Sequence, residues 1–386
     1  AAAREAEMLW AAAGWCLGTA VACYLFFYFS KLVSRVQLHC EDNGWTRAVL
    51  AHTPLLRGWY WPPLFCFNRN LNGLLLMKLR ATVDPAYRRE VVLADDGASL
   101  ELDWAEEEGL PPSAPVLLML SGVTGNSRSS YITNLMVQCR ARGWRGVVLN
   151  YPSATGNPLT APRFFCLDSV SDTKQFVEHV HGLYPDAPLV ALGFSLGAHF
   201  FMKYFEKVPD APILAAALVS SPWSAETCYD FWQGQWVHEN LYDQHFLNRF
   251  QGDFRKNVEL FRKLPYLDVE KILACKNTME FHEALSVPLF RFRSIDDYWE
   301  AYDSSAEVEK VKLPYLVLHA WNDPVVPPNA VPLSRVLHNR HAIFAATDSG
   351  GHTGWLSPLR FWGLSWCERV LLQYVEGVLA AGPPPQ

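Results

Sequence analysis

The stretch Leu189-Val190-Ala191-Leu192-Gly193-Phe194-Ser195-Leu196-Gly197 decides how the rest of the sequence is interpreted. Its first four residues form an apolar run typical of a buried strand, and the residues from 196 to 208 suit a helix. A serine therefore stands in a strand-turn-helix, with a glycine two residues away on either side. In a turn this tight, a Cβ atom at either of the two flanking positions would collide with neighbouring main-chain atoms, and glycine has no Cβ. The stretch predicts a nucleophile elbow in which Gly193 and Gly197 make the turn and Ser195 is the nucleophile.

The sequence around this elbow alternates between apolar strands and helical segments. Residues 87–94 and 99–104 indicate two paired strands, joined by a turn at 95–97. Further apolar runs follow at 116–120, 146–150, 189–194, 213–219, 315–319 and 342–346. Unbroken apolar runs are typical of parallel strands that are buried on both faces. The pattern predicts an α/β fold, with a mostly parallel central sheet, helices on both faces and a helical cap inserted at about 223–310.

Two further residues fit the order serine, acid, histidine that such a fold requires. Asp323 follows the strand at 315–319, in Ala320-Trp321-Asn322-Asp323-Pro324. His352 follows the last strand, in the glycine-flanked loop Ser349-Gly350-Gly351-His352-Thr353-Gly354. Each residue alone has a plain explanation, an Asp-Pro turn or a histidine on a surface loop. Because all three stand in order at strand ends, the sequence predicts a catalytic triad of Ser195, Asp323 and His352.

Acyl transfer to a serine also needs N–H donors for the negative oxygen of the tetrahedral intermediate. The main-chain N–H of Leu196, directly after the nucleophile, is one candidate. The second is expected from the loop after the strand at 116–120, where Ser121-Gly122-Val123-Thr124-Gly125 stands. We select Val123 as this second donor.

Composition excludes several other classes of protein. The chain has 386 residues, 50% of them hydrophobic, 19% charged and 13% aromatic, with a net charge of -6. A basic footprint for nucleic acid is therefore not expected. The nine cysteines are scattered and form no C-x-x-C pair, and neither a zinc-protease nor a P-loop motif occurs. We expect no cofactor and no metal.

The N-terminal region is predicted to attach the protein to a membrane. Residues 9–29 are uncharged and long enough to cross the hydrocarbon core, and their aromatic end continues past a possible signal-cleavage site at 20–22. We expect an uncleaved anchor in the endoplasmic reticulum or another intracellular membrane. The short flank 1–8 precedes it, and Lys31 and Arg35 after it favour a cytosolic catalytic domain, although the side stays open.

Three further ranges complete the predicted organisation. Residues 30–86 form a juxtamembrane arm that either packs on the domain or rests in the membrane interface, since it contains Trp59-Tyr60-Trp61 and the run 74–77. Residues 87–376 form the catalytic domain, and 377–386 form a proline-rich tail. Near the start of the insertion, candidate walls of a substrate site are Trp223, Phe231, Trp232 and Trp236.

Several motifs together resemble a known family. These are Leu120-Ser121-Gly122-Val123-Thr124-Gly125-Asn126-Ser127, the elbow, Asn322-Asp323-Pro324 and Gly350-Gly351-His352-Thr353-Gly354-Trp355. They are similar to motifs of the membrane-anchored proteins of AB hydrolase family 4, over about residues 60–375. That family includes phospholipases, monoacylglycerol lipases and carboxylesterases. The resemblance implies a membrane-anchored serine hydrolase that acts on acyl esters of membrane glycerolipids and assigns the triad to the same three residues.

The sequence departs from this family at three places. Ser121-Gly122 stands where relatives tend to have Pro-Gly or His-Gly, Asn150-Tyr151-Pro152-Ser153 replaces Asn-x-Arg-Gly, and Ala198 replaces a glycine. These departures bear on substrate preference more than on catalysis. Two alternatives remain. A lipid acyltransferase is one, because His181-x4-Asp186 and His238-x4-Asp243 match a pattern linked to acyl transfer in related hydrolases. A non-catalytic lipid-binding protein on the same fold is the other.

Overall fold

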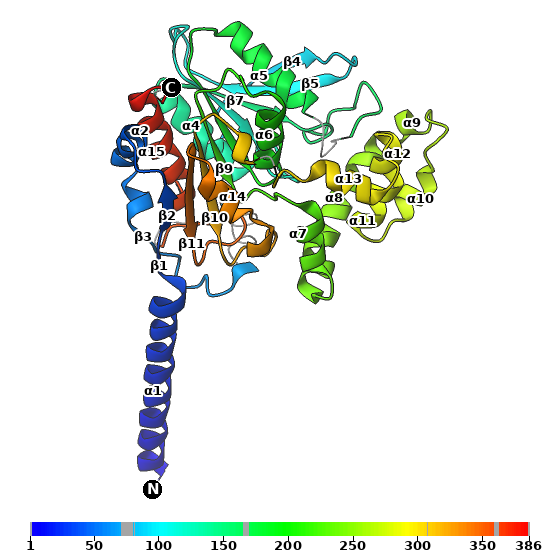
Figure 1. Cartoon of the computed structure of the whole chain (residues 1–386). Coiled ribbons are helices and arrows are strands. Elements are labelled where there is room, and N and C mark those ends of the chain that lie inside the picture. The colour runs from blue at the N-terminus through cyan, green and yellow to red at the C-terminus, as the bar shows by residue number, and fades with distance from the viewer. Residues whose placement is uncertain are drawn as a thin grey trace.

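The computed structural model describes residues 2–70, 80, 82–164, 170–306, 308–358 and 363–384. The apolar run at 74–77 lies outside these residues. The chain begins with a long helix, α1 (Ala2–Phe27), which continues into a π-helical turn, η1 (Tyr28–Leu32). Figure 1 shows α1 projecting from the domain as a separate rod. The segment Arg4–Leu32 is long and apolar enough to cross a membrane, with a mean hydropathy of 1.5.

Nine strands form the central sheet, in the order β2-β11-β10-β9-β8-β6-β7-β5-β4. The six strands from β6 to β11 are parallel to one another, whereas β2 pairs antiparallel with β11, β5 with β7, and β4 with β5. The strands are β2 (Gln37–Cys40), β4 (Arg88–Leu93), β5 (Ser99–Ala105), β6 (Val116–Leu120), β7 (Arg145–Asn150), β8 (Leu189–Phe194), β9 (Ala215–Val219), β10 (Tyr315–Ala320) and β11 (Ala342–Thr347). The predicted fold class is confirmed.

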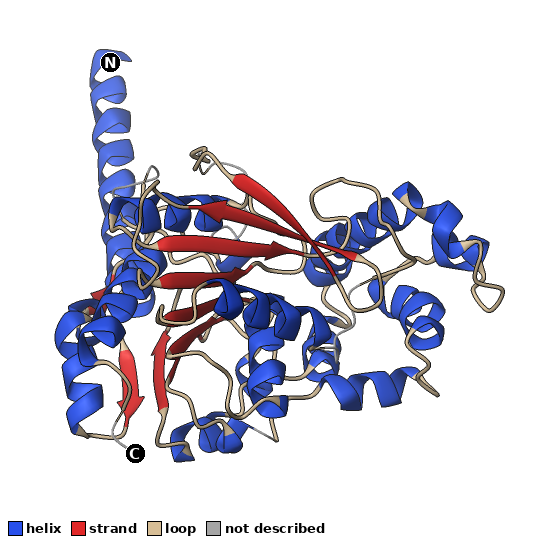
Figure 2. Cartoon of the chain, turned by 90° about the horizontal axis from the view of Figure 1, so that it is seen from above, coloured by secondary structure: helices blue, strands red, loops and turns tan. Residues whose placement is uncertain are grey.

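Helices cover both faces of this sheet (Figure 2). Alternate residues of β6 enter different cores: Leu118 packs in one, and Leu117 and Met119 pack in the other. This explains the unbroken apolar run, because both faces of the strand are buried. The first core is covered by α5 (Ser171–Leu183), α6 (Leu196–Lys207) and α14 (Leu333–His338), and the second by α2 (Gly44–His52), α4 (Ser130–Ala141) and α15 (Trp366–Ala381).

The insertion between β9 and β10 is helical and lies beside the sheet (Figure 1). Its α-helices are α7 (Ala225–Trp232), α8 (Gln244–Lys256), α9 (Val258–Phe261), α10 (Val269–Ala274), α11 (Thr278–Phe281), α12 (Val287–Leu289) and α13 (Ile295–Tyr302). The π-helical turns η3 (His238–Asp243) and η4 (His282–Ser286) join them. Many of its aromatic side chains, among them Phe250 and Phe281, pack into the first core.

The segment after α1 folds onto the domain more closely than a loose arm would. Its strand β2 becomes the edge of the central sheet beside β11, and β1 (Ser34–Arg35) pairs with β3 (Trp59–Tyr60). Tyr60 is fully buried, while Trp59 and Trp61 are 54% and 44% exposed. Tyr60 thus packs on the domain, whereas contact of the exposed Trp59 and Trp61 with a membrane stays a prediction.

Candidate active site

Ser195 occupies a strained turn between β8 and α6. Its φ and ψ are 51° and -118°, a conformation that L-residues rarely adopt. A Cβ atom on Gly197 would lie 2.3 Å from the carbonyl oxygen of Leu120, and one on Gly193 would lie 2.5 Å from the Cα of Ala198. Both contacts are with main-chain atoms, so no side-chain adjustment relieves them. The local packing thus explains why glycine stands at both positions.

The structure brings Ser195, His352 and Asp323 into one hydrogen-bonded chain. Ser195 Oγ lies 2.8 Å from His352 Nε2, and His352 Nδ1 lies 2.9 Å from Asp323 Oδ2. The imidazole can therefore donate from Nδ1 to the carboxylate and accept from the serine hydroxyl at Nε2. All three residues follow parallel strands, β8, β10 and β11, at the same edge of the sheet.

Asp323 is held as a carboxylate by its surroundings. Burial by itself disfavours the charged form, but the positive charge of a protonated His352 and its hydrogen bond outweigh this effect and lower the pKa of Asp323 below its usual range. The main-chain N–H groups of Val325 and Val326 also donate to Oδ1, over 2.7 and 3.0 Å. The carboxylate is 1% exposed and fixed in orientation.

The loop that contains His352 is fixed by neighbours on both sides. Gly351 donates its N–H to Asn322 Oδ1 over 2.9 Å, which ties this loop to the loop of Asp323. Gly350 has φ 157°, and a Cβ there would lie 2.5 Å from Trp355 Nε1. That indole donates to Thr347 Oγ1 at the end of β11. The residues of the Gly-Gly-His-Thr-Gly-Trp motif therefore hold one another in place.

The two main-chain N–H groups expected at the oxyanion site belong to residues that line the cavity beside Ser195. Val123 and Leu196 both line it. Across the part of the chain that the structure describes, neither N–H donates a hydrogen bond. The loop containing Val123 is braced by two tyrosines: Tyr131 Oη accepts from Gly122 N over 3.0 Å, and Tyr151 Oη donates to the Ser121 carbonyl over 2.5 Å.

Tyr151 stands in one of the segments that depart from the family pattern. Its hydroxyl supports the loop around Val123, and its ring packs against Phe200 with centroids 5.7 Å apart. The preceding Asn150 accepts from Ser127 N through Oδ1, over 2.9 Å. The altered segment thus has a defined structural role beside the predicted oxyanion site.

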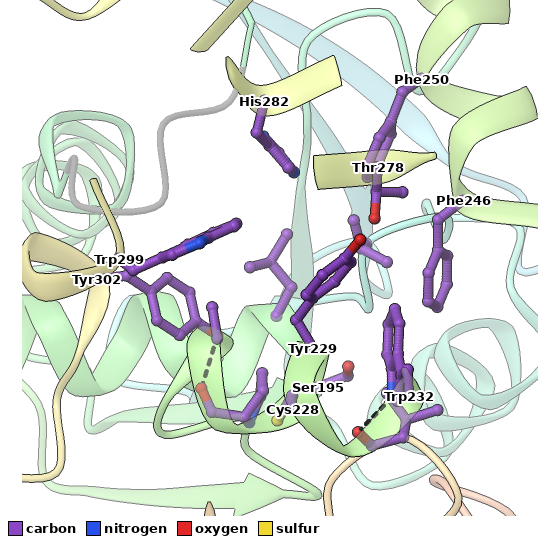
Figure 3. Close-up of a pocket in the computed structure, with 15 residues that line it drawn as sticks. Ser195, Cys228, Tyr229, Trp232, Phe246, Phe250, Thr278, His282, Trp299 and Tyr302 are labelled. Atoms are coloured by element: carbon purple, nitrogen blue, oxygen red, sulfur yellow. Dashed lines mark hydrogen bonds between the residues drawn. The ribbon is translucent and has the colours of Figure 1, made fainter. Parts of the chain in front are cut away.

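An apolar cavity begins at Ser195 and extends beneath the cap. Figure 3 shows Trp299 and Tyr302 on one side of it, Trp232 and Phe246 on the other, and Phe250, Thr278 and His282 further from the serine. Burial lowers the pKa of His282 to about 4 and raises that of Tyr229 to about 12. These groups are therefore neutral at pH 7, so the cavity suits an uncharged chain.

Of the four predicted wall residues, Trp232 lines this cavity and the other three do not. Trp223 is buried in the first core. Phe231 packs edge-on against His238 at 5.2 Å, and Trp236 is 69% exposed. The lining residues that the sequence did not reveal include Tyr229, Phe246, Phe250, His282, Trp299 and Tyr302. Ala225, Cys228, Tyr229 and Trp232 recur at helical spacing along one face of α7, and this signal could have found that wall.

A second, more polar cleft meets the apolar cavity at Ser195. Ser195, Val123, Phe246 and Val325 line both. The cleft also contains His352, His245, Arg80 and Arg128. Arg80 is buried and paired with Glu368, whereas the exposed Arg128 has no ion pair with any described residue. Ser195 therefore lies where the apolar cavity joins a cleft that also contains polar and charged side chains.

The two His-x4-Asp pairs lie in separate surroundings. His238 Nε2 is 2.7 Å from the carbonyl oxygen of Pro324, directly after Asp323. Asp243 accepts hydrogen bonds from the main chain and hydroxyl of Thr278. His181 lies on α5 and Asp186 in the turn after it. Within the described residues, no group of three or more His, Cys, Asp or Glu side chains is placed to hold a metal ion.

A parallel sheet with a serine elbow after β8, and with histidine and aspartate after β11 and β10, defines a serine hydrolase of the α/β-hydrolase type. Residues 162–349 match the profile of a family described as serine aminopeptidase, S33. The chain has the fold of the α/β-hydrolases, as the sequence motifs indicated.

The relatives of this chain include enzymes with lipid substrates in their names. It is 28% identical to phospholipase ABHD3 of Homo sapiens over 374 residues, which cover 95% of this chain and 90% of the relative. It is 24% identical to monoacylglycerol lipase ABHD2 of Danio rerio, covering 93% of this chain and 90% of that protein. Among solved structures, an acylaminoacyl peptidase of Pyrococcus horikoshii aligns with a TM-score of 0.48 at 15% identity, over 79% of this chain and 42% of that one.

Proposed function

We propose that this protein is a membrane-anchored serine hydrolase that cleaves acyl ester bonds of glycerolipids. The observation that supports this most is the position of the Ser195–His352–Asp323 chain at the junction of an apolar cavity and a cleft that also contains charged and polar side chains. The relatives named phospholipase and monoacylglycerol lipase align over nearly the whole chain and favour the same substrate class.

The proposed reaction begins when Ser195 Oγ attacks the ester carbonyl and passes its proton to His352 Nε2. Asp323 keeps Nδ1 protonated and stabilises the imidazolium. The main-chain N–H groups of Leu196 and Val123 donate to the negative oxygen, each worth about 3 kcal/mol. The imidazolium then protonates the departing alcohol. Water, deprotonated by His352, attacks the acyl-enzyme and releases the fatty acid, which restores the serine.

The apolar cavity and the second cleft would bind different parts of the substrate. The acyl chain would lie in the cavity between Trp232 and Trp299, where its burial is worth about 0.8 kcal/mol per CH₂. The glycerol and its polar substituent would lie in the cleft that contains His245 and Arg128. This arrangement points the scissile bond at Ser195.

We further propose that α1 is the membrane anchor, expected in the endoplasmic reticulum or another intracellular membrane. Met8–Phe27 comprises 20 residues, which at 1.5 Å per residue span about 30 Å, the thickness of a hydrocarbon core. The side chains of residues 8–23 are all exposed. A lipid environment would therefore cover apolar surface that water otherwise contacts.

The direct test is to reconstitute the full chain in phosphatidylcholine nanodiscs and to measure fatty acid and lysolipid by mass spectrometry, with monoacylglycerol as a second substrate. We expect release that Ser195→Ala abolishes. Equal release by the variant, or none from either lipid, would contradict the proposal. If acyl groups appear on an added lysolipid in preference to water, the protein is an acyltransferase.

A further inference from the structure

Six large apolar side chains are exposed at the end of the domain from which α1 projects. We name them the apolar rim; their exposed fractions lie between 44% and 69%, and they are Trp59, Trp61, Leu64, Phe67, Trp236 and Leu241. The first four belong to the juxtamembrane segment, drawn in light blue beside the upper end of α1 in Figure 1. The last two follow α7, which reaches down on the same side. An exposed apolar surface of this kind is typical of a site that contacts a membrane or another protein.

The juxtamembrane part of the rim is held against the last turns of the N-terminal helix. Tyr28 Oη donates to the Pro62 carbonyl over 2.6 Å, and the hydroxyl of Tyr24 donates to the carbonyl of Leu64. The rings of Phe29 and Trp61 meet edge-on at 6.0 Å. This part of the rim therefore lies at a fixed height on the helix, where the helix joins the domain.

The end of the same segment contacts the cap beside the other two rim residues. Arg69 Nη2 donates to Gln235 Oε1 over 3.3 Å, and its guanidinium lies 5.5 Å from the ring centroid of Phe231. Tyr242 Oη donates to Asn70 Oδ1 over 3.0 Å. Because Gln235 and Tyr242 adjoin Trp236 and Leu241 in sequence, these contacts link both halves of the rim.

The rim also borders the cleft that contains the nucleophile. Tyr242, directly after Leu241, lines that cleft together with Ser195 and His352. On the juxtamembrane side, Phe65 packs against the Cys66–Leu356 cluster with Tyr131, which supports the loop of Val123. The mouth of the cleft and the rim therefore belong to the same end of the molecule.

We propose that the apolar rim is a membrane-docking surface, which rests in the interface of the bilayer that α1 crosses and brings the cleft to the lipid. This inference rests on the proposed function. If residues 8–27 occupy the hydrocarbon core, the Phe29–Trp61 contact falls just beyond it, at the level where tryptophan and tyrosine are enriched. Residues 54–70 contain two arginines and no carboxylate, which suits lipid phosphates.

A kinetic test uses the full chain in phosphatidylcholine nanodiscs, with Trp59, Leu64 and Phe67 all changed to serine. The matched control changes Val91, Leu93 and Leu183 to serine, which are 59%, 72% and 48% exposed and lie on β4 and α5. We expect the rim variant to hydrolyse bilayer phospholipid at least about tenfold more slowly, since docking depends on buried apolar area. Its hydrolysis of soluble p-nitrophenyl butyrate should stay within about twofold of the parent. The control should lose neither activity.

Equal rates of bilayer hydrolysis in the rim variant and the control would overturn the docking proposal while leaving the hydrolase intact. A measurement independent of activity separates the two proposals further. A spin label on Leu64→Cys should be more accessible to oxygen than to a water-soluble nickel chelate, and a label on Leu93→Cys should show the reverse. Both labels are placed in a background with Cys16, Cys23 and Cys40 changed to serine. Water-like accessibility at position 64 would contradict the docking proposal even if the enzyme is active.

Discussion

Ser349 Oγ donates a hydrogen bond to the main-chain carbonyl of Leu32 over 2.6 Å, and this contact joins the end of the N-terminal helical segment to the loop of His352. Two further contacts reinforce the junction. The N–H of Asp348 donates to Ser34 Oγ over 3.1 Å, and Gln37 bridges Asp348 and the indole of Trp321. Residues beside both predicted catalytic loops are thus hydrogen-bonded to the segment that follows α1.

Gln37→Ala should lower kcat several-fold with little change in KM. The side chain accepts from Trp321 Nε1 over 2.8 Å and donates to Asp348 over 3.1 Å, so its loss frees one residue near Asp323 and one near His352. Each hydrogen bond contributes about 0.5–1.5 kcal/mol. The measurement is steady-state kinetics on a soluble ester.

Gln373→Ala is the matched control for that variant. Gln373 accepts from Leu55 N over 3.4 Å, a contact that involves neither loop. Its replacement should leave kcat unchanged. If both variants lose activity equally, the effect reflects general loosening and not positioning of the catalytic loops.

Ala225→Phe should shift the acyl-chain preference toward shorter esters. Ala225 lines the apolar cavity from α7, and a phenyl ring there would shorten the space available beside Ser195. Because each CH₂ contributes about 0.8 kcal/mol, the loss of two or three buried groups should lower kcat/KM for long-chain relative to butyryl esters by at least about tenfold.

Glu226→Phe adds the same ring one residue further along α7, at a position that is exposed. The chain-length profile of this control should match that of the parent. An unchanged profile in Ala225→Phe would mean that the acyl chain lies elsewhere.

The free energy of unfolding should fall as the pH is lowered from 6.5 toward 4, in part because of His282. Burial lowers its pKa to about 4, so the folded state keeps it neutral while the unfolded chain takes up the proton near pH 6.5. The unfolded state binds more protons in this interval, so stability is present above it and is lost on acidification. At pH 5 the effect is about 2 kcal/mol.

His282→Gln removes this titration and should flatten the pH dependence, measured by denaturant unfolding at pH 7 and pH 5. Burial also lowers the pKa of His319 to about 4. His319 remains in both proteins and contributes equally to the pH dependence of the free energy of unfolding in each. An identical loss of stability in the variant and the parent would contradict a buried neutral His282.

The sheet could be predicted because its central strands are buried on both faces. The runs that became β6 and β8 match the prediction residue for residue, and β7 and β9 differ from it by one or two residues. β2 could not be predicted, since Gln-Leu-His-Cys is four residues long, lies at an edge and has no apolar run. Its pairing with β11 depends on tertiary contacts that leave no local pattern.

The site shows a similar division. Ser195, Asp323 and His352, which the structure brings together, could be predicted because each follows a strand, and the motifs of Ser195 and His352 contain residues with positive φ. The cavity walls could not be located from aromatic content alone. Trp236 stands among aromatic residues but is exposed, whereas His282 and Trp299 reach the cavity from parts of the cap far away in sequence.

The most direct test of the account is labelling of the full chain by a fluorophosphonate, with the adduct mapped by mass spectrometry. The 2.8 Å contact between His352 Nε2 and Ser195 Oγ predicts one adduct, on Ser195. Labelling should disappear in Ser195→Ala and slow by orders of magnitude in Asp323→Asn. An adduct on another residue, formed as fast in Ser195→Ala as in the parent, would contradict the proposed nucleophile.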